Sequence, residues 1–291
     1  MTAISIVSFN TKNLLQDCLN SLKSQDGSSK LNIWVLDNNS SDGSAEMVEK
    51  EFPDVNLIRS DINLGFAKGQ NQILKKIKDK YVLVLNPDTK IEEKAITEMV
   101  RVMENNPECA VLGSKLIDFN GNLESNGGDF PFGLALFSWL FNLESLMLPN
   151  FHRTDLNYYK KTHQVDWVSG TFMMTRSNIF EKAGFFNEEF FMYFEDCEFC
   201  YRVKKSGFKV MINPGVVVKH KSGSSSKNPR FFQWKSEFEG LIKFYYIYKG
   251  FLGVFYLRLL INLAVILRII AFLITGEFKK SAIYAKVIIS I

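Results

Sequence analysis

Short apolar runs and amphipathic stretches alternate along the first part of the chain. Apolar runs at residues 4–9, 31–36, 55–58 and 81–85 predict strands. Between these runs, apolar residues recur at helical spacing, as in Leu15, Leu19 and Leu22, which predicts helices that bury one face. Such regular alternation is typical of a parallel α/β sheet with helices packed on it.

The run at residues 81–85 is almost entirely apolar and continues into Asn86-Pro87-Asp88. A strand of this kind is buried on both faces, as in the centre of a helix-covered sheet. Pro87 has no backbone N–H to donate, so the strand should end there and leave Asp88 at its carboxyl end. Ligands bind at that edge of α/β sheets. Asp88 could therefore hold a divalent cation against a phosphate, or it could cap the next turn or helix.

The second half of the chain mixes strands and helices less regularly. Asn120-Gly121 between two apolar segments is a strong signal for a β-hairpin, and Gly170 should interrupt its strand. The predicted elements, in chain order, are a helix at 92–104, strands at 109–113 and 165–174, a helix that opens at Glu195, short strands at 209–212 and 216–218, and a loop at 222–230.

Two apolar segments stand apart from this pattern. Residues 130–164 carry many aromatic and aliphatic residues with little charge, which fits an insert that shapes an acceptor site, an apolar flap near a membrane, or a plain packed helix. Residues 251–276 are long enough to cross a bilayer. Arg258, Asn262 and Arg268 would share one helical stripe, which favours helices in the membrane interface over a span, an oligomer contact or a soluble packing face.

Charge and cysteine content narrow the functional classes. The 291 residues carry a net charge of +4, and the six Lys/Arg and one acid from residue 249 onward place that bias in the tail. The body is therefore not expected to bind nucleic acid, whereas the tail suits an anionic cytoplasmic membrane surface. Four cysteines make no disulfide framework, and Cys197 and Cys200 are expected to face the core rather than bind zinc. No signal peptide is evident, because residues 3–8 already form a strand pattern.

Acidic residues occur at predicted strand ends and helix starts, and singly each could be a helix cap. Their order, however, resembles the inverting family-2 glycosyltransferases with the GT-A fold, especially the rhamnosyltransferase-like branch, over residues 3–245. The fold implied is a Rossmann-like, mostly parallel sheet flanked by helices. The matching segments are residues 7–10, 35–44, 63–71, 85–88, 169–174, 191–196 and 220–224.

The resemblance implies a division of the chain. Residues 1–113 would bind the nucleotide-sugar, residues 114–245 would contain the acceptor and catalytic half, and residues 246–291 would form a helical membrane tail. Asn86 stands where the family's D-x-D motif has its first acid, and Asp88 and His220 would ligate Mg²⁺ or Mn²⁺. The residues implied in donor binding are Ser8, Asn10, Asp37, Asn39, Asp42, Gly65, Asn71, Asn86 and Asp88.

Asp196 would be the general base for the acceptor hydroxyl, with Glu195 as the alternative base or a hydroxyl-binding group. Glu198 and Arg202, one helical turn apart, are expected to form a structural pair. The best match for the donor is dTDP-L-rhamnose, and UDP-sugars remain open. The acceptor would be a glycan or lipid-linked saccharide at the cytoplasmic face of the cell membrane, with a homo-oligomer as a further possibility.

Two other functions fit parts of the sequence. A sugar-nucleotide pyrophosphorylase also builds a Rossmann-like sheet around a nucleotide, but the first strand is not followed by the Gly-rich loop with Arg and Lys that holds a triphosphate. An inactive, membrane-bound sugar-nucleotide binder is the second alternative, because Asn86 removes one acid from the metal motif and fold alone does not establish activity.

Overall fold

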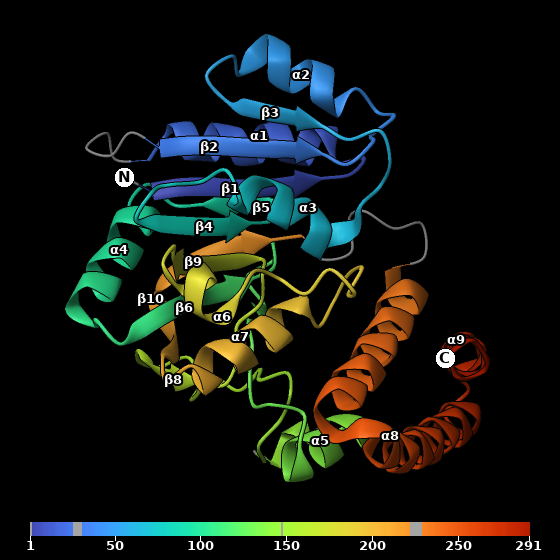
Figure 1. Ribbon diagram of the computed structural model, residues 1–291. Coiled ribbons are helices and arrows are strands. Elements are labelled where there is room, and N and C mark those ends of the chain that lie inside the picture. Colours follow the sequence, from blue (N-terminus) through green and yellow to red (C-terminus); the bar gives the residue numbers. More distant parts are fainter. Residues whose placement is uncertain (1, 26–30, 147, 222–228) are drawn as a thin grey trace.

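A single mixed sheet with helices on both faces forms the body of the molecule (Figure 1). The computed structural model describes residues 2–25, 31–146, 148–221 and 229–291, so most of the predicted loop at 222–230 lies outside the described residues. The strand order is β3 (Asn56–Arg59), β2 (Leu31–Asp37), β1 (Thr2–Ser8), β4 (Tyr81–Leu85), β9 (Phe172–Arg176), β6 (Cys109–Ile117), β10 (Lys209–His220) and β5 (Thr89–Ile91).

Strand direction divides the sheet into two parts. β3, β2, β1 and β4 are mutually parallel, with Ser8 opposite Asp37 at the carboxyl ends of β1 and β2. β9 then runs antiparallel to both β4 and β6. The predicted parallel α/β half is confirmed, and β9 connects it to a second half that the alternation of elements did not reveal.

The helices cover both faces of the sheet. The side chains of α1 (Lys12–Lys23), α2 (Ser44–Glu51) and α4 (Ala95–Asn105) share one buried cluster with β1 and β4. On the other face pack α3 (Gly65–Leu74), α6 (Ile179–Ala183) and α7 (Glu195–Lys205). This three-layer arrangement buries β4 completely, as its apolar sequence predicts.

Three predicted elements differ in detail. The helix expected at 92–104 begins at Ala95, because residues 89–91 form β5 and pair with β10. The two short strands at 209–212 and 216–218 are one strand, β10, with a register shift between Asn213 and Val217. Gly170 lies before β9, where a Cβ atom would approach the Phe66 ring to 2.8 Å.

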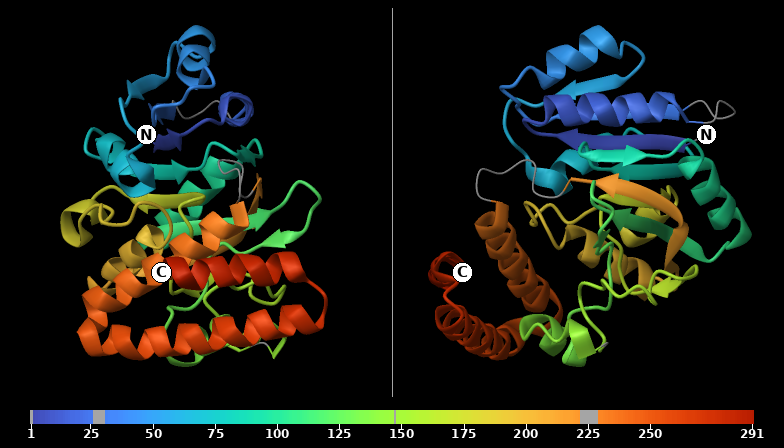
Figure 2. Two further views of the ribbon diagram at one scale, coloured as in Figure 1. Left: turned by 90° about the vertical axis from the view of Figure 1, so that its right-hand side faces the viewer. Right: turned by 180° about the vertical axis from the view of Figure 1, so that it is seen from behind.

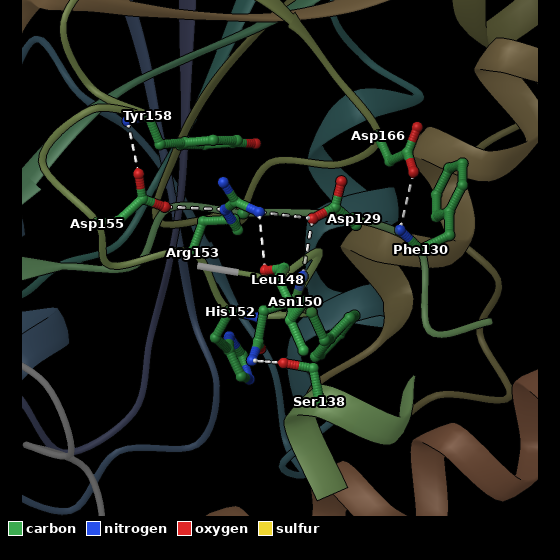
Figure 3. Close-up of polar contacts among 12 residues, drawn as sticks. Asp129, Phe130, Ser138, Leu148, Asn150, His152, Arg153, Asp155, Tyr158 and Asp166 are labelled. Atoms are coloured by element: carbon green, nitrogen blue, oxygen red, sulfur yellow. Dashed lines mark hydrogen bonds and ion pairs between the residues drawn. The ribbon is translucent and has the colours of Figure 1, made fainter. Parts of the chain in front are cut away.

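Within the apolar insert at residues 130–164, a short helix packs on the core and the Arg153 side chain makes several polar contacts. In α5 (Gly133–Leu140), Trp139 and Leu140 are buried, as expected for a packed helix. Figure 3 shows the Arg153 guanidinium between Asp129 and Asp155, at 3.4 and 3.0 Å, where it also donates to the Leu148 carbonyl. The insert ends in a short 3₁₀ turn (Glu144–Leu146), an irregular stretch and β8 (His163–Val165), which pairs with β10.

The C-terminal segment is a bent pair of helices. α8 (Pro229–Ile274) changes direction at Gly250, whose φ is +65°, and α9 (Phe278–Ser290) runs back along its second half (Figure 2). By length and composition, residues 231–274 could cross a membrane, although 22% of the most apolar window is buried against the protein. Arg268 donates to the carbonyls of Trp139 and Leu140 at the end of α5, so this side chain of the predicted polar stripe faces the protein.

Candidate functional site

The edge at the carboxyl ends of β1 and β2 contains the buried carboxylate of Asp37. Asp37 Oδ2 accepts from the Ser40 N–H (3.0 Å), whereas Asp37 Oδ1 has no hydrogen-bond partner in the part of the chain that the structure describes. Ser8 is buried and bonds Thr11 (2.9 Å), and Asn10 Oδ1 accepts from the Ser41 N–H (2.8 Å). These two side chains shape the loops, and Asp37 Oδ1 can accept an N–H from a ligand such as a pyrimidine base.

Asp42 is used structurally in this turn. One carboxylate oxygen accepts from the Lys12 N–H at the start of α1 (2.8 Å), and the other accepts from the N–H (3.0 Å) and hydroxyl of Ser44 at the start of α2. Burial opposes ionisation of Asp42, but these hydrogen bonds outweigh it and lower its pKa. These contacts hold the Asp42 carboxylate at the starts of both helices, and its implied contact with ribose or base stays a prediction. Asn39 is exposed in the same turn, with a φ of +66°.

Gly65 and Asn71, which the resemblance implies in donor binding, contact the segment that leads into α7. A Cβ at Gly65 would lie 2.3 Å from the Phe191 carbonyl oxygen, so the close backbone approach is to residue 191. The Asn71 amide donates to the Phe186 carbonyl (2.8 Å) and to Glu188 (3.0 Å), and its oxygen accepts from the Phe186 N–H. Both residues fasten α3 to the segment that leads into α7, which leaves Asn71 no free amide for a phosphate.

Asp88 and His220 meet at the end of β4, as the resemblance implies. His220 Nε2 lies 3.3 Å from Asp88 Oδ1, and His220 Nδ1 lies 2.7 Å from Glu124 Oε2. Burial disfavours the charged imidazole, but the two carboxylates outweigh it and raise the pKa of His220 to about 9. The strand-end position brings Asp88 here, and β10 brings His220 beside it, opposite Thr89 of β5.

The Asp88–His220 pair fits a divalent cation. Among the described residues, the buried Asp88 Oδ1 has no hydrogen-bond partner, and the His220 Nε2 faces it at 3.3 Å. One carboxylate oxygen and one imidazole nitrogen suit Mn²⁺, whereas Mg²⁺ prefers an all-oxygen set. Two protein donors leave the other coordination positions to water and ligand phosphates, and Asn86 instead donates to the Thr171 hydroxyl at 3.4 Å.

Glu195 and Asp196 begin α7, where Glu195 is buried and Asp196 is half-buried. Burial and the neighbouring Asp196 raise the pKa of Glu195 well above its ordinary value, and no described residue hydrogen-bonds to Glu195 Oε2. Burial also raises the pKa of Asp196, although the N–H groups of Gly170 (3.0 Å) and Cys197 (2.7 Å) donate to its two oxygens and oppose that rise. A carboxylate of raised pKa at a helix start is suited to accept a proton.

The turn before these acids is held in an uncommon conformation. Tyr193 and Phe194 have φ values of +69° and +73°, in the left-handed region that non-glycine residues rarely adopt. Gly240 of α8 packs on Phe194, where a Cβ would lie 2.8 Å from the Phe194 Cβ. The first part of α8 therefore supports the acidic turn, and Tyr248 further along α8 donates to Glu198 (2.6 Å).

The expected structural residues of α7 are confirmed. Arg202 Nε lies 2.8 Å from Glu198 Oε1, one helical turn away, and Arg202 Nη2 donates to the Phe185 carbonyl (2.7 Å). Cys197 and Cys200 are fully buried in the apolar core. Among the residues that the structure describes, no group of three or more His, Cys, Asp or Glu side chains is arranged around a common metal position.

The matching family model is described as "Glycosyl transferase family 2" and covers residues 3–184. The chain belongs to this family. Among curated relatives of this family-2 protein, "Rhamnosyltransferase WbbL" of Escherichia coli K12 is 24% identical over 84% of this chain and 93% of its own. An "N-acetylglucosaminyl-diphospho-decaprenol L-rhamnosyltransferase" of Mycobacterium tuberculosis is 23% identical over 68% and 69% of the two chains.

Solved structures share the fold. Staphylococcus aureus TarS residues 1–349 in complex with UDP superimposes with a TM-score of 0.53 at 17% identity, over 83% of this chain and 65% of that one. GalNAc-T7 with UDP, GalNAc and Mn²⁺ gives a TM-score of 0.60 at 14% identity, over 83% and 47%. The family-2 chain thus spans less than two thirds of these solved chains. The implied GT-A architecture is confirmed.

The sequence did not point to three residues beside the site of this family-2 protein, Glu124, His152 and Glu237. Glu124 follows the hairpin signal at Asn120-Gly121, so only its position on a strand was visible. His152 lies in the insert, and its Nε2 is 3.7 Å from Glu237 Oε1 of α8. His152 also favours the ionised form of Asp196. No local pattern marks these residues, because each reaches the site through contacts between distant segments.

Proposed function

We propose that this protein is an inverting glycosyltransferase that moves a sugar from a nucleoside diphosphate to a hydroxyl of a glycan acceptor in cell-surface polysaccharide synthesis. One observation carries the proposal: residues 170 and 171 hydrogen-bond both to the loop that holds Asp88 and to Asp196. The Asn86 N–H donates to the Thr171 carbonyl (3.0 Å), and the Gly170 N–H donates to Asp196 (3.0 Å). A cation site and a base on neighbouring loops are what displacement of a diphosphate requires.

Asp196 is the proposed general base. It takes the proton of the acceptor hydroxyl while that oxygen forms its bond to the anomeric carbon from the face opposite the diphosphate. The bond from that carbon to the diphosphate breaks, and its electron pair leaves with the nucleoside diphosphate. A divalent cation held by Asp88 and His220 would supply positive charge to this leaving group.

The donor is proposed to be dTDP-L-rhamnose. The names of the Escherichia coli and Mycobacterium tuberculosis relatives support a rhamnosyl donor. The free Asp37 Oδ1 supports a pyrimidine nucleotide, because it can accept the N3–H that thymine and uracil share. UDP-sugars are the second candidate, favoured by the UDP in the TarS complex.

The acceptor is proposed to be a glycan or lipid-linked saccharide presented on the insert side of the site. A hollow of about 590 Å³ there is lined by Asn150, His152, Arg153 and Asn157, among others, which offer several hydrogen-bonding groups. His152 relates this hollow to the acidic turn, because its Nε2 lies 3.7 Å from Glu237 Oε1 and its charge favours the ionised form of Asp196. The name of the mycobacterial relative supports an acceptor carried on a polyprenyl diphosphate.

A donor screen tests the proposed reaction. The full-length protein is incubated with dTDP-L-rhamnose, UDP-glucose or UDP-GlcNAc, with and without Mn²⁺, and release of the nucleoside diphosphate is followed. We expect slow, Mn²⁺-stimulated release of dTDP, because water can replace the acceptor. Release of UDP alone would change the donor. A requirement for a sugar phosphate with a nucleoside triphosphate would indicate a pyrophosphorylase, and donor binding without turnover, even with glycan acceptors, would indicate an inactive binder.

We further propose that the second half of α8 lies on the cytoplasmic face of the cell membrane. Apolar side chains that remain exposed recur along one side of this helix, which favours contact with lipid. The exposed set is Phe251, Leu252, Phe255, Tyr256, Leu259, Leu263, Ile266, Leu267, Ile270, Leu273 and Ile274. Lys279 and Lys286 on α9 supply charge suited to anionic headgroups.

The combined change Leu259→Glu and Leu263→Glu tests this surface. The two side chains are 54% and 51% exposed and one helical turn apart, so the folded protein should tolerate glutamate there. We expect co-sedimentation with vesicles containing anionic lipid to fall by at least tenfold, because two charges would enter the acyl boundary. Ile62→Glu, at a 62% exposed site in the nucleotide half, is the control. Unchanged sedimentation of the double variant would contradict the proposed orientation.

A further inference from the structure

A short hairpin places Glu124 beside the candidate cation site. β7 (Leu123–Glu124) pairs antiparallel with β6, with Glu124 opposite Leu116. The connecting turn is held by Asp118, which accepts from the N–H groups of Asn120 and Asn122, each at 2.8 Å. Glu124 therefore sits on a defined strand rather than on a free loop, and its side chain reaches His220 on β10.

The two ring nitrogens of His220 have different partners. Nδ1 lies 2.7 Å from Glu124 Oε2, and Nε2 lies 3.3 Å from Asp88 Oδ1. The side chains of His220 and Glu124 are only 12% and 22% exposed, so water competes little for the contact between them. A carboxylate that accepts the Nδ1–H leaves Nε2, the nitrogen that faces Asp88, as the electron-pair donor in the neutral ring.

We propose that Glu124 is a positioning residue that orients His220 for a divalent cation and raises the basicity of its Nε2. This inference rests on the proposed function, because it concerns the cation that Asp88 and His220 would hold. Histidines that ligate metals commonly donate their second N–H to a carboxylate, which sets the tautomer and the ring orientation. Loss of such a partner typically weakens metal affinity by about 10–100-fold.

Glu124→Ala and Glu124→Gln in the full-length protein test the proposal. Mn²⁺ is titrated in the presence of UDP or dTDP, and free Mn²⁺ is measured by electron paramagnetic resonance against a protein-free nucleotide reference. We expect Glu124→Ala to weaken Mn²⁺ binding by about 10–100-fold. Glu124→Gln should lose less, because its amide oxygen still accepts the Nδ1–H but carries no charge.

Electron spin-echo modulation of bound Mn²⁺ gives a readout that a purely structural role would not produce. Wild-type protein should show coupling to the imidazole nitrogen, and Glu124→Ala should weaken that coupling even at saturating Mn²⁺. Glu108→Gln is the matched control: Glu108 is 69% exposed, precedes β6 at its far end and pairs with Lys209. This variant should match the wild type, and circular dichroism confirms that each variant is folded.

The outcomes separate this inference from the proposed function. Wild-type affinity and unchanged nitrogen coupling in both Glu124 variants would overturn the role of Glu124 alone. Nucleotide affinity that falls equally with Mn²⁺ and with EDTA would also overturn it, because Glu124 would then contact the donor directly. Sugar transfer by a wild-type protein that binds no Mn²⁺ would overturn the cation site, and this inference with it, while leaving the transferase activity in place.

Discussion

The two carboxylate sites of this family-2 protein lie on neighbouring loops but have opposite electrostatic surroundings. Asp88 faces a histidine whose pKa is raised to about 9 by the two carboxylates around it. Glu195 and Asp196 adjoin each other, and burial raises the pKa of both. The same kind of side chain is thus arranged to hold positive charge at one loop and to take up a proton at the other.

Both carboxylate sites depend on residues that are distant in sequence. Asp88 gains His220 from the last strand of the sheet, and the Glu195–Asp196 turn is held by Gly240 of α8. Burial also raises the pKa of Tyr193, with the carboxylates of Glu237, Glu195, Asp88 and Asp196 adding to the rise, so its hydroxyl lies within electrostatic reach of both sites. The strained turn at Tyr193 and Phe194 therefore lies between the Asp88–His220 pair and the Glu195–Asp196 pair.

The largest expected effect comes from Asp196→Asn. Removal of the proposed general base should lower kcat by about 10²–10⁴-fold, while donor affinity stays near that of the wild type because the proposed diphosphate site is unchanged. Steady-state transfer assays and calorimetric nucleotide titration measure the two quantities. Asp54→Asn, an exposed change in the turn before β3, is the control. Full activity of Asp196→Asn would remove this residue from the proposed reaction.

Asp88→Asn should produce the complementary result. Nucleotide affinity in Mn²⁺ should fall by about 10–100-fold, because the amide oxygen is a poorer ligand than a carboxylate. Affinity in EDTA should change little. Titration calorimetry under both conditions measures the ratio. Equal losses with and without Mn²⁺ would mean that Asp88 contacts the nucleotide directly, and the comparison with Asp196 would then no longer rest on a cation.

A smaller effect, on stability rather than rate, is expected for Glu195→Gln. The folded pKa of Glu195 lies well above its ordinary value near 4.5, so above that value the folded state holds a proton that the unfolded chain has released. Stability should therefore fall as pH rises from about 4.5 through the folded pKa. Glutamine removes this dependence and should raise Tm at pH 7.5 by about 2–4 °C, for roughly 1 kcal/mol.

Thermal melts of the wild type and Glu195→Gln across pH 5–8 measure this prediction. Glu198→Gln is the informative control, because Glu198 is equally buried on the same helix but is paired with Arg202 and Tyr248. Breaking that pair should lower Tm. A lower Tm for Glu195→Gln as well would show that Glu195 has a stabilising partner, and the contrast between the two sites would be weaker.

Much of the fold and part of the site could be predicted from the sequence. The apolar run at β4 and the chemistry of Pro87 place Asp88 at a strand end, and the helical spacing of Phe199, Cys200 and Val203 indicates α7. Asn71 shows what such reasoning does not reach. Its amide suits a phosphate, but in the fold it bonds the backbone at residue 186, which is distant in sequence.

The sequence by itself determined the alternation of strands and helices, the family, and the strand-end and helix-start positions of the acidic residues. The alternation and these positions depend on local periodicity and on the stereochemistry of proline and glycine, whereas the family follows from the order of the motifs. Only the tertiary structure decided that Glu124 contacts His220, that Asp42 caps two helices and that Arg268 turns toward α5. Those contacts depend on the order of strands in the sheet and on the bend at Gly250. Both bring together segments that are far apart in the sequence, so no local sequence pattern predicts them.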